Sequence, residues 1–205
     1  MDQLKTENHE IITVVSGLPR SGTSLMMQML RAGGLTCLTD ELREADISNP
    51  KGYFEFEKVK GLRADNSWLP EAKGKVIKII SHLLSCLPPE LNYKIIFMER
   101  DLGEVLASQR KMLANQGRGE ENLSDERLGQ IFAQQLRQVR KMLADRQIST
   151  LFLGYKDVLE DPVEISTQLQ AFLGNNLDQQ AMRDVVDRNL YRQRLKPSKM
   201  SGYTR

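Results

Sequence analysis

The chain has 205 residues, of which 40% are hydrophobic and 27% are charged, as in an average soluble globular protein. This composition argues against a disordered chain, a collagen-like repeat and a disulfide-dependent miniprotein. The 29 Lys and Arg exceed the 27 Asp and Glu by two, an excess too small for general binding to nucleic acid. The excess is concentrated in residues 183–205, which hold seven basic and two acidic side chains. This basic C-terminal segment suits either an anionic ligand or a solvated tail.

The chain has few residues that form disulfides or bind metals. Cys37 and Cys86 lie among apolar residues without metal-ligand spacing, which indicates buried thiols in a reducing compartment. His9 and His82 are the only histidines, so we expect no metal site. The charged N-terminus lacks the apolar core of a signal peptide, and no apolar run approaches the ~20 residues that span a bilayer. These features predict a cytoplasmic protein without membrane contact.

Short apolar runs alternate along the chain with segments of helical pattern. The predicted strands are residues 11–16, 35–38, 76–80, 94–98 and 148–153. The predicted helices are residues 22–31, 54–63, 101–113 and 124–145, with a last helix after Asp161, where an N-cap, a proline and a glutamate follow the spacing of a helix start. Alternating strands and helices predict a single α/β domain of three layers, in which helices flank a parallel sheet.

The first predicted strand runs into the loop Gly17-Leu18-Pro19-Arg20-Ser21-Gly22-Thr23-Ser24, and a helix follows. A glycine-rich turn at the carboxyl end of a strand lets backbone N–H groups surround an anion, and the helix N-terminus adds partial positive charge. The spacing is close to the nucleotide-binding pattern G-x-x-x-x-G-K-[ST], so the fold is expected to be P-loop-like. Thr23 stands where that pattern has lysine, which argues against an ATP or GTP hydrolase. A turn that serves only strand-to-helix packing is the alternative.

The segment Pro19-Arg20-Ser21-Gly22-Thr23-Ser24 resembles the 5′-phosphosulfate loop of sulfotransferases, which use 3′-phosphoadenosine 5′-phosphosulfate (PAPS). Arginine inside the loop is most similar to the tyrosylprotein and bacterial members. The resemblance implies that Pro19, Arg20, Ser21, Gly22, Thr23 and Ser24 bind the donor, and that no metal is required.

A second match lies on the fourth predicted strand and the helix after it. In the family, an arginine at a strand end and a serine eight residues later hold the 3′-phosphate of the nucleotide. Arg100 and Ser108 have this spacing here. A guanidinium fork and a hydroxyl can bond one phosphate together. A surface ion pair for Arg100 and a solvated helix position for Ser108 are the alternatives.

A third match covers residues 151–162 and 171–174, which resemble the late strand and helix of the family. By this resemblance Tyr155 lies near the adenosine half of the nucleotide; an aromatic that closes the core edge is the other interpretation. Lys156 replaces the usual glutamate, so no role is carried over to it. The Arg-Lys-Gly loop of cytosolic members is absent, and Arg192 and Arg194 are the basic residues that could replace it on the 3′-phosphate.

The transfer of a sulfuryl group needs cations beside the transferred group and a base beside the acceptor. We expect Arg20 and Lys78, at the end of the third predicted strand, to be the cations. Glu41, 21 residues after Arg20, corresponds in position to the catalytic glutamate of the tyrosylprotein members. His82 is the second candidate, from a loose resemblance to the Lys-Thr-His-Leu-Pro segment of cytosolic members. Residues 49–55 are common in bacterial members and are expected to shape the acceptor side.

The sequence therefore predicts a sulfotransferase that moves a sulfuryl group from PAPS to a hydroxyl or amine of a small-molecule or peptide acceptor. The alternatives are a P-loop kinase for a nucleotide or metabolite, and a family member that binds nucleotide without catalysis. A homo-oligomer is compatible with the sequence.

Overall fold

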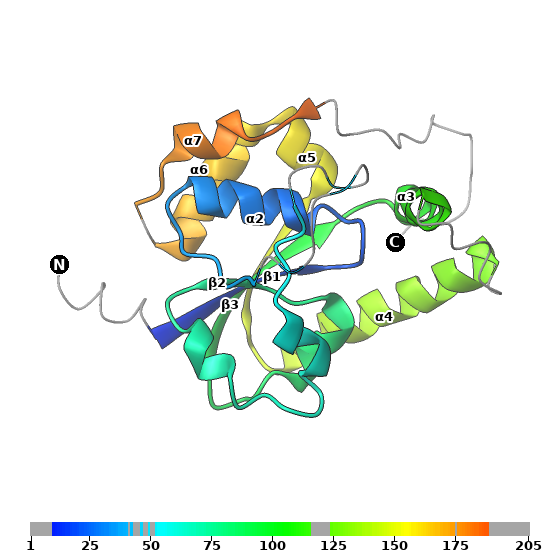
Figure 1. The fold of residues 1–205 in the computed structure, drawn as a ribbon, viewed down its shortest axis with the longest axis horizontal. Helices are drawn as coiled ribbons and strands as arrows, with labels where there is room; N and C mark the ends of the chain where they lie inside the picture. The colour runs from blue at the N-terminus through cyan, green and yellow to red at the C-terminus, as the bar shows by residue number, and fades with distance from the viewer. Residues whose placement is uncertain are drawn as a thin grey trace.

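The computed structural model describes residues 10–40, 42, 46, 49, 52–115, 124–174 and 176–188. Its centre is a four-stranded parallel sheet in the order β2-β1-β3-β4 (Figure 1). The strands are β1 (Ile11–Gly17), β2 (Val76–Lys78), β3 (Asn92–Glu99) and β4 (Ser149–Gly154). β1 and β3 are almost fully buried, as expected of central strands that read as continuous apolar runs.

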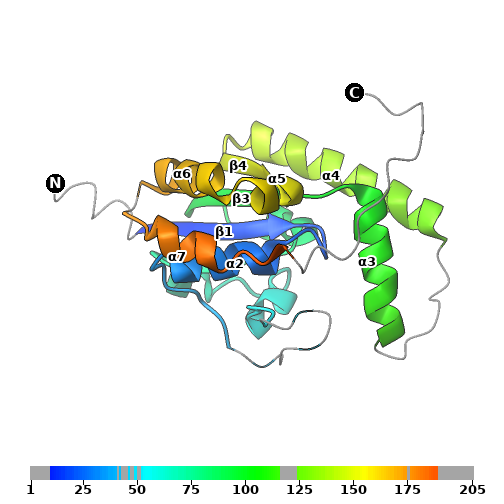
Figure 2. The same ribbon diagram turned by 90° about the horizontal axis from the view of Figure 1, so that it is seen from above.

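Helices cover both faces of the sheet (Figures 1 and 2). One face packs against α2 (Thr23–Ala32), α5 (Tyr155–Glu160), α6 (Pro162–Leu173) and α7 (Gln179–Asp184). The other face packs against α4 (Asp125–Asp145) and three short 3₁₀ helices, η1 (Glu57–Gly61), η2 (Leu69–Ala72) and η3 (Ser81–Cys86). These layers confirm the predicted α/β fold with a parallel sheet flanked by helices.

The helix α3 (Leu102–Asn115) lies beyond the carboxyl ends of the strands and covers neither face of the sheet (Figure 2). It begins where predicted, because the carboxylate of Asp101 accepts a hydrogen bond from the backbone N–H of Glu104 at 3.1 Å. The strand β3 therefore leads directly into a helix that stands beside the open edge of the sheet.

The register of the parallel strands determines which residues meet at that edge. Lys78 pairs with Val15, and Gly17 pairs with Met98, two residues before Arg100. On the other side of β3, Glu99 pairs with Gly154, so Tyr155 begins its helix beside the end of β3. The sheet thus brings four parts of the chain that are far apart in the sequence to one edge: Lys78, the loop after β1, Arg100 and Tyr155.

Three expected elements differ in the structure. Residues 35–38 form one isolated parallel bridge, Cys37 to Val76, and not a strand. The chain first closes α2 through a hydrogen bond from the N–H of Leu35 to the carbonyl of Leu30, which leaves little length to pair. The helix expected at residues 54–63 is only the 3₁₀ helix η1. The strand expected at residues 76–80 ends at Lys78. Among the described residues, no helix has the length and apolar character needed to cross a membrane.

Candidate active site

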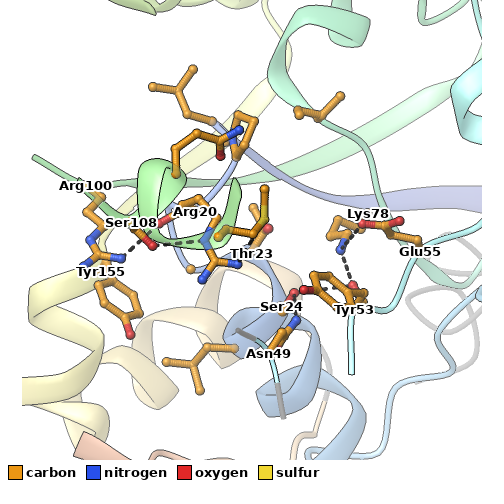
Figure 3. Close-up of a pocket in the computed structure, with 18 of the residues that line it drawn as sticks. Arg20, Thr23, Ser24, Asn49, Tyr53, Glu55, Lys78, Arg100, Ser108 and Tyr155 are labelled. Carbon is orange, nitrogen blue, oxygen red and sulfur yellow. Dashed lines mark hydrogen bonds and ion pairs between the residues drawn. The ribbon is translucent and has the colours of Figure 1, made fainter. Parts of the chain in front are cut away.

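A cavity of about 490 Å³ lies at the carboxyl edge of the sheet. Its walls come from the loop after β1, the start of α2, the second half of α3 and the segment before η1. Carboxyl ends of parallel strands are where open α/β sheets bind ligands. The close-up in Figure 3 shows polar side chains from these separate elements pointing toward one another.

The loop after β1 has a backbone shape that two of its glycines make possible. Gly17 and Gly22 have φ angles of 151° and 100°, in the region that L side chains rarely adopt. A Cβ on Gly17 would lie 2.6 Å from the carbonyl oxygen of Met98, and one on Gly22 would overlap the ring of Tyr155. Ser21 closes the turn by donating its hydroxyl to the carbonyl of Leu18 at 2.8 Å. The loop is therefore held close to both β3 and α5.

Arg20 reaches from this loop across the cavity to α3. Its Nε donates to the hydroxyl of Ser108 at 3.0 Å, and Arg100 donates to the backbone carbonyl of Arg20 at 3.1 Å (Figure 3). Ser108 is buried, on the side of α3 that faces the sheet edge. The structure thus brings the loop arginine, the strand-end arginine and the helix serine into one hydrogen-bonded group.

Arg100 is held in place by its surroundings. Its Nε lies 2.9 Å from a carboxylate oxygen of Glu104, one turn into α3, and both side chains are over nine-tenths buried. Its guanidinium lies 4.6 Å from the centre of the Tyr155 ring. Arginine stacked on an aromatic ring and paired with a carboxylate loses little further freedom when it binds an anion. This arrangement suits a fixed anion receptor.

A second polar group lies around the end of β2, where residues of the 49–55 segment approach the cavity. Lys78 donates from Nζ to the carbonyl of Tyr53, and its Nζ lies 3.7 Å from a carboxylate oxygen of Glu55 (Figure 3). Ser24, at the start of α2, accepts a hydrogen bond from the side-chain amide of Asn49 at 3.0 Å. Residues of the 49–55 segment therefore contact both Ser24, at the end of the glycine-rich loop, and Lys78, at the end of β2.

The electrostatic character of the cavity follows from its cations. Burial lowers the pKa of Arg20, while the neighbouring Tyr53 opposes that shift and Arg100 adds to it. Arginine still stays protonated at neutral pH, because its ordinary pKa exceeds about 12. Burial also raises the pKa of the Tyr155 hydroxyl, and Arg100 opposes that shift. Arg20, Arg100 and Lys78 around one partly enclosed cavity favour a ligand with several negative charges.

Most of the site residues expected from the sequence line the cavity. These are Pro19, Arg20, Gly22, Thr23, Ser24, Lys78, Arg100, Ser108 and Tyr155. Ser21 belongs to the same loop, but it is buried and does not line the cavity. Glu41, Arg192 and Arg194 lie outside the described residues.

His82 is the predicted site residue that the structure places elsewhere. It is exposed on η3 and is not part of the cavity wall. The reason is the early end of β2 at Lys78, after which the chain turns into a 3₁₀ helix. Ile80 is still extended and lines the cavity as Lys78 does, two residues before it. The helix then begins at Ser81, and it brings Leu83 instead of His82 to the cavity wall.

The structure adds residues that the sequence did not single out. Glu55 and Asp187 are the two carboxylates among the described residues of the cavity wall. An apolar wall accompanies Glu55, made by Phe56, Val59, Ile80 and Leu83. Glu55 is the last residue of the 49–55 motif, but the contact of Glu55 with Lys78 depends on how two segments distant in the sequence pack together.

Comparisons with known proteins bear on the family and the fold of this chain. The profile of the sulfotransferase domain matches residues 11–205. A search of the curated proteins gives no match. Among solved structures, a sulfotransferase domain from the curacin biosynthetic pathway is 18% identical with a TM-score of 0.50, and 80% of this chain aligns with 73% of that one.

Two further similar structures are complexes with PAP, which is adenosine 3′,5′-bisphosphate. Mouse sulfotransferase SULT7A1 complexed with PAP is 17% identical with a TM-score of 0.52, and the alignment covers 90% of this chain and 67% of that one. Retinol dehydratase in complex with androsterone and the inactive cofactor PAP is 16% identical with a TM-score of 0.50, and the alignment covers 87% and 64%. The chain thus spans about two thirds of the length of these two proteins.

Proposed function

The chain belongs to the sulfotransferase domain family, and we propose that it transfers a sulfuryl group from PAPS to a hydroxyl or amine of a small acceptor. The observation that carries this proposal is the group formed by Arg20, Ser108 and Arg100. It joins a glycine-rich anion loop to a second anion receptor in the same cavity, through contacts of 3.0 and 3.1 Å. A donor with phosphate groups at both its 5′ and 3′ positions needs two such receptors.

The proposed donor site divides between these receptors. The backbone of residues 17–22 and the hydroxyls of Thr23 and Ser24 would hold the 5′ end at the start of α2. Arg100 and Ser108 would hold the 3′-phosphate, and Tyr155 would lie against the adenosine half. Gly17 and Gly22 keep the loop in the position this division requires, since a Cβ at either position would collide with Met98 or with the ring of Tyr155. Arg192 and Arg194 stay predictions for the same phosphate.

The catalytic cations proposed are Arg20 and Lys78. Bound PAPS supplies an activated sulfuryl group whose leaving oxygen belongs to the 5′-phosphate. Arg20 comes from the loop after β1 and Lys78 from the end of β2, and both line the cavity. Together they would provide positive charge where negative charge develops on the leaving oxygen. The acceptor side has the apolar wall described above, so we propose a small-molecule acceptor with an apolar body in preference to a peptide. A homo-oligomer stays a prediction.

Thermal unfolding with nucleotides tests the donor site. Adenosine 3′,5′-bisphosphate should raise the unfolding temperature, because a ligand at about 100 times its dissociation constant stabilises the native state by about 2.7 kcal/mol. Adenosine 5′-monophosphate, and ADP with magnesium, should each have a much smaller effect. Stabilisation by ADP with magnesium but not by the bisphosphate would contradict the proposal and favour a kinase. Binding of the bisphosphate without turnover of radiolabelled PAPS would favour the family member that binds nucleotide without catalysis.

A further inference from the structure

The residue that removes the proton from the acceptor has to lie in the cavity, on the side away from the adenosine. Among the described residues of the cavity wall, the carboxylates are Glu55 and Asp187, and no histidine is present. Asp187 follows α7 and acts electrostatically on Tyr155, which places it at the adenosine end. Glu55 is on the other side, next to Lys78. Glu55 is therefore the described carboxylate positioned toward the acceptor.

The backbone around Glu55 is firmly attached to a neighbouring segment. Its carbonyl accepts a hydrogen bond from the hydroxyl of Thr39 at 2.8 Å and one from the N–H of Asp40 at 3.2 Å. Its side chain retains 27% of its exposure, so the carboxylate is partly accessible, whereas that of Lys78 retains 13%. A carboxylate at a fixed position with access to the cavity can reach a small ligand there.

The surroundings of Glu55 match the two requirements of an acceptor. Phe56 and Val59 follow it along the chain, and Ile80 and Leu83 complete an apolar wall. Lys78 lies 3.7 Å away, and Arg20 lines the same cavity. An apolar body could thus pack on the wall while its hydroxyl lies between a carboxylate and the cations that surround the sulfuryl group.

We propose that Glu55 is the general base of the reaction, an assignment that rests on the proposed function. The acceptor oxygen forms a bond to sulfur as the bond from sulfur to the bridging 5′-phosphate oxygen breaks, and that oxygen keeps the electron pair. The hydroxyl proton of the acceptor passes to the carboxylate of Glu55 and from there to solvent. Lys78 and Arg20 stabilise the charge on the phosphate oxygen. Sulfur keeps its oxidation state, and no further reactant is needed.

Two phenols of similar shape but different acidity test this role. 4-Methylphenol is protonated at about pH 8 and needs a base, whereas 4-nitrophenol is largely ionised there and does not. Glu55→Gln should lower the rate with 4-methylphenol and radiolabelled PAPS about 10²–10⁴-fold, and the rate with 4-nitrophenol less than about tenfold. Transfer to water, measured as released inorganic sulfate, should fall like that with 4-methylphenol, since water is also protonated.

Three controls make the result specific. Glu57→Gln alters an exposed carboxylate two residues along the same segment, outside the cavity wall, and should leave all three rates unchanged. Affinity for adenosine 3′,5′-bisphosphate and the unfolding temperature of Glu55→Gln should match those of the wild type. Glu41→Gln in the same assays tests the glutamate predicted from the sequence.

Each other outcome contradicts the assignment in a distinct way. Equal losses with both phenols would make Glu55 a residue that positions Lys78 or the acceptor. An acidity-dependent loss in Glu41→Gln but not in Glu55→Gln would give the role to Glu41. A wild-type protein that binds the bisphosphate but transfers the sulfuryl group of PAPS to no phenol, alcohol or amine and not to water would overturn the proposed function itself, and the assignment with it.

Discussion

Replacing Arg100 tests the proposed donor site most directly, but the structure shows that the simple variant has two effects. Arg100 and Glu104 form an ion pair of 2.9 Å with both side chains over nine-tenths buried. Removing one partner of a buried pair typically costs about 3–5 kcal/mol of stability, because an uncompensated charge stays behind. Arg100→Gln alone should therefore lose stability as well as 3′-phosphate affinity.

The double variant Arg100→Gln with Glu104→Gln separates the two effects. It removes both charges and leaves two amides that can bond to each other, so most of the lost stability should return. A charge-assisted hydrogen bond contributes about 1.5–3 kcal/mol, which corresponds to roughly ten- to 150-fold in affinity for a 3′-phosphorylated nucleotide. Affinity for adenosine 5′-monophosphate, which lacks that phosphate, should change little.

Isothermal titration gives the affinity for each of the two nucleotides and urea unfolding gives the stability, for the wild type, the single variant and the double variant. The expected pattern is a double variant of near wild-type stability whose preference for the bisphosphate over the monophosphate has fallen roughly ten- to 150-fold. Recovery of bisphosphate affinity together with stability would refute the reasoning, because Arg100 would then act only as the partner of Glu104. Equal losses for both nucleotides would place Arg100 away from the 3′-phosphate.

The donor side of the site could be predicted from the sequence because its residues lie at the ends of regular elements. The loop from Gly17 follows a strand whose apolar run is unambiguous, and Arg100 follows another. Parallel strands bring their carboxyl ends to one edge whatever the lengths of the connections between them. The resemblance to the family singled out Ser108, and a spacing of eight residues places it about two helical turns beyond the end of β3.

The acceptor side could not be predicted in the same way, because it is built from irregular segments. Glu55 belongs to an extended stretch without period, and only tertiary packing brings it to Lys78. The expected strand at residues 76–80 was too long by two residues, and this affects His82. A continuing strand would point alternate side chains, Lys78, Ile80 and then His82, toward the cavity edge. The 3₁₀ helix begins at Ser81 and brings Leu83 there in place of His82.

α5 was missed for a related reason. The sequence around Tyr155 resembles the end of a strand and a turn, but the helix begins at Tyr155 without a connecting loop. A Cβ on Gly154 would meet the carboxylate of Asp157, so glycine lets that side chain lie against the backbone where the strand ends and the helix begins. The result matters for the site, because Tyr155 as the first residue of α5 lies under Arg100 and against Gly22.

The remaining predictions concern the loop, the excluded histidine and the loop arginine. Gly22→Ala should lose about 1–3 kcal/mol of stability in urea unfolding and much of its affinity for the bisphosphate, since its added Cβ overlaps Tyr155. Gly34→Ala is the control for backbone strain alone, because Gly34 has a φ of 98° and a Cβ there would have nothing within 4 Å. His82→Asn should keep turnover within about twofold of the wild type, since an exposed side chain outside the cavity rarely matters by more than about 0.5 kcal/mol. Arg20→Ala should lower the rate of sulfuryl transfer about 10²–10³-fold, because loss of one such donor to a transition state typically costs about 2.7–4 kcal/mol.

Arg20 needs a control that separates its charge from the shape of the loop. Its φ of 70° strains alanine as much as arginine, so Arg20→Ala should keep the native backbone and lose the side chain with its contacts, among them those with Ser108 and Met112. Arg31→Ala removes a cation from the last turn of α2, outside the cavity wall, and should leave the rate unchanged. If charge at the transferred group is what matters, Arg20→Lys should recover part of the rate that Arg20→Ala loses. An Arg20→Ala protein within threefold of the wild-type rate would mean that Arg20 only braces α3 through Ser108, and the catalytic cation would then be Lys78.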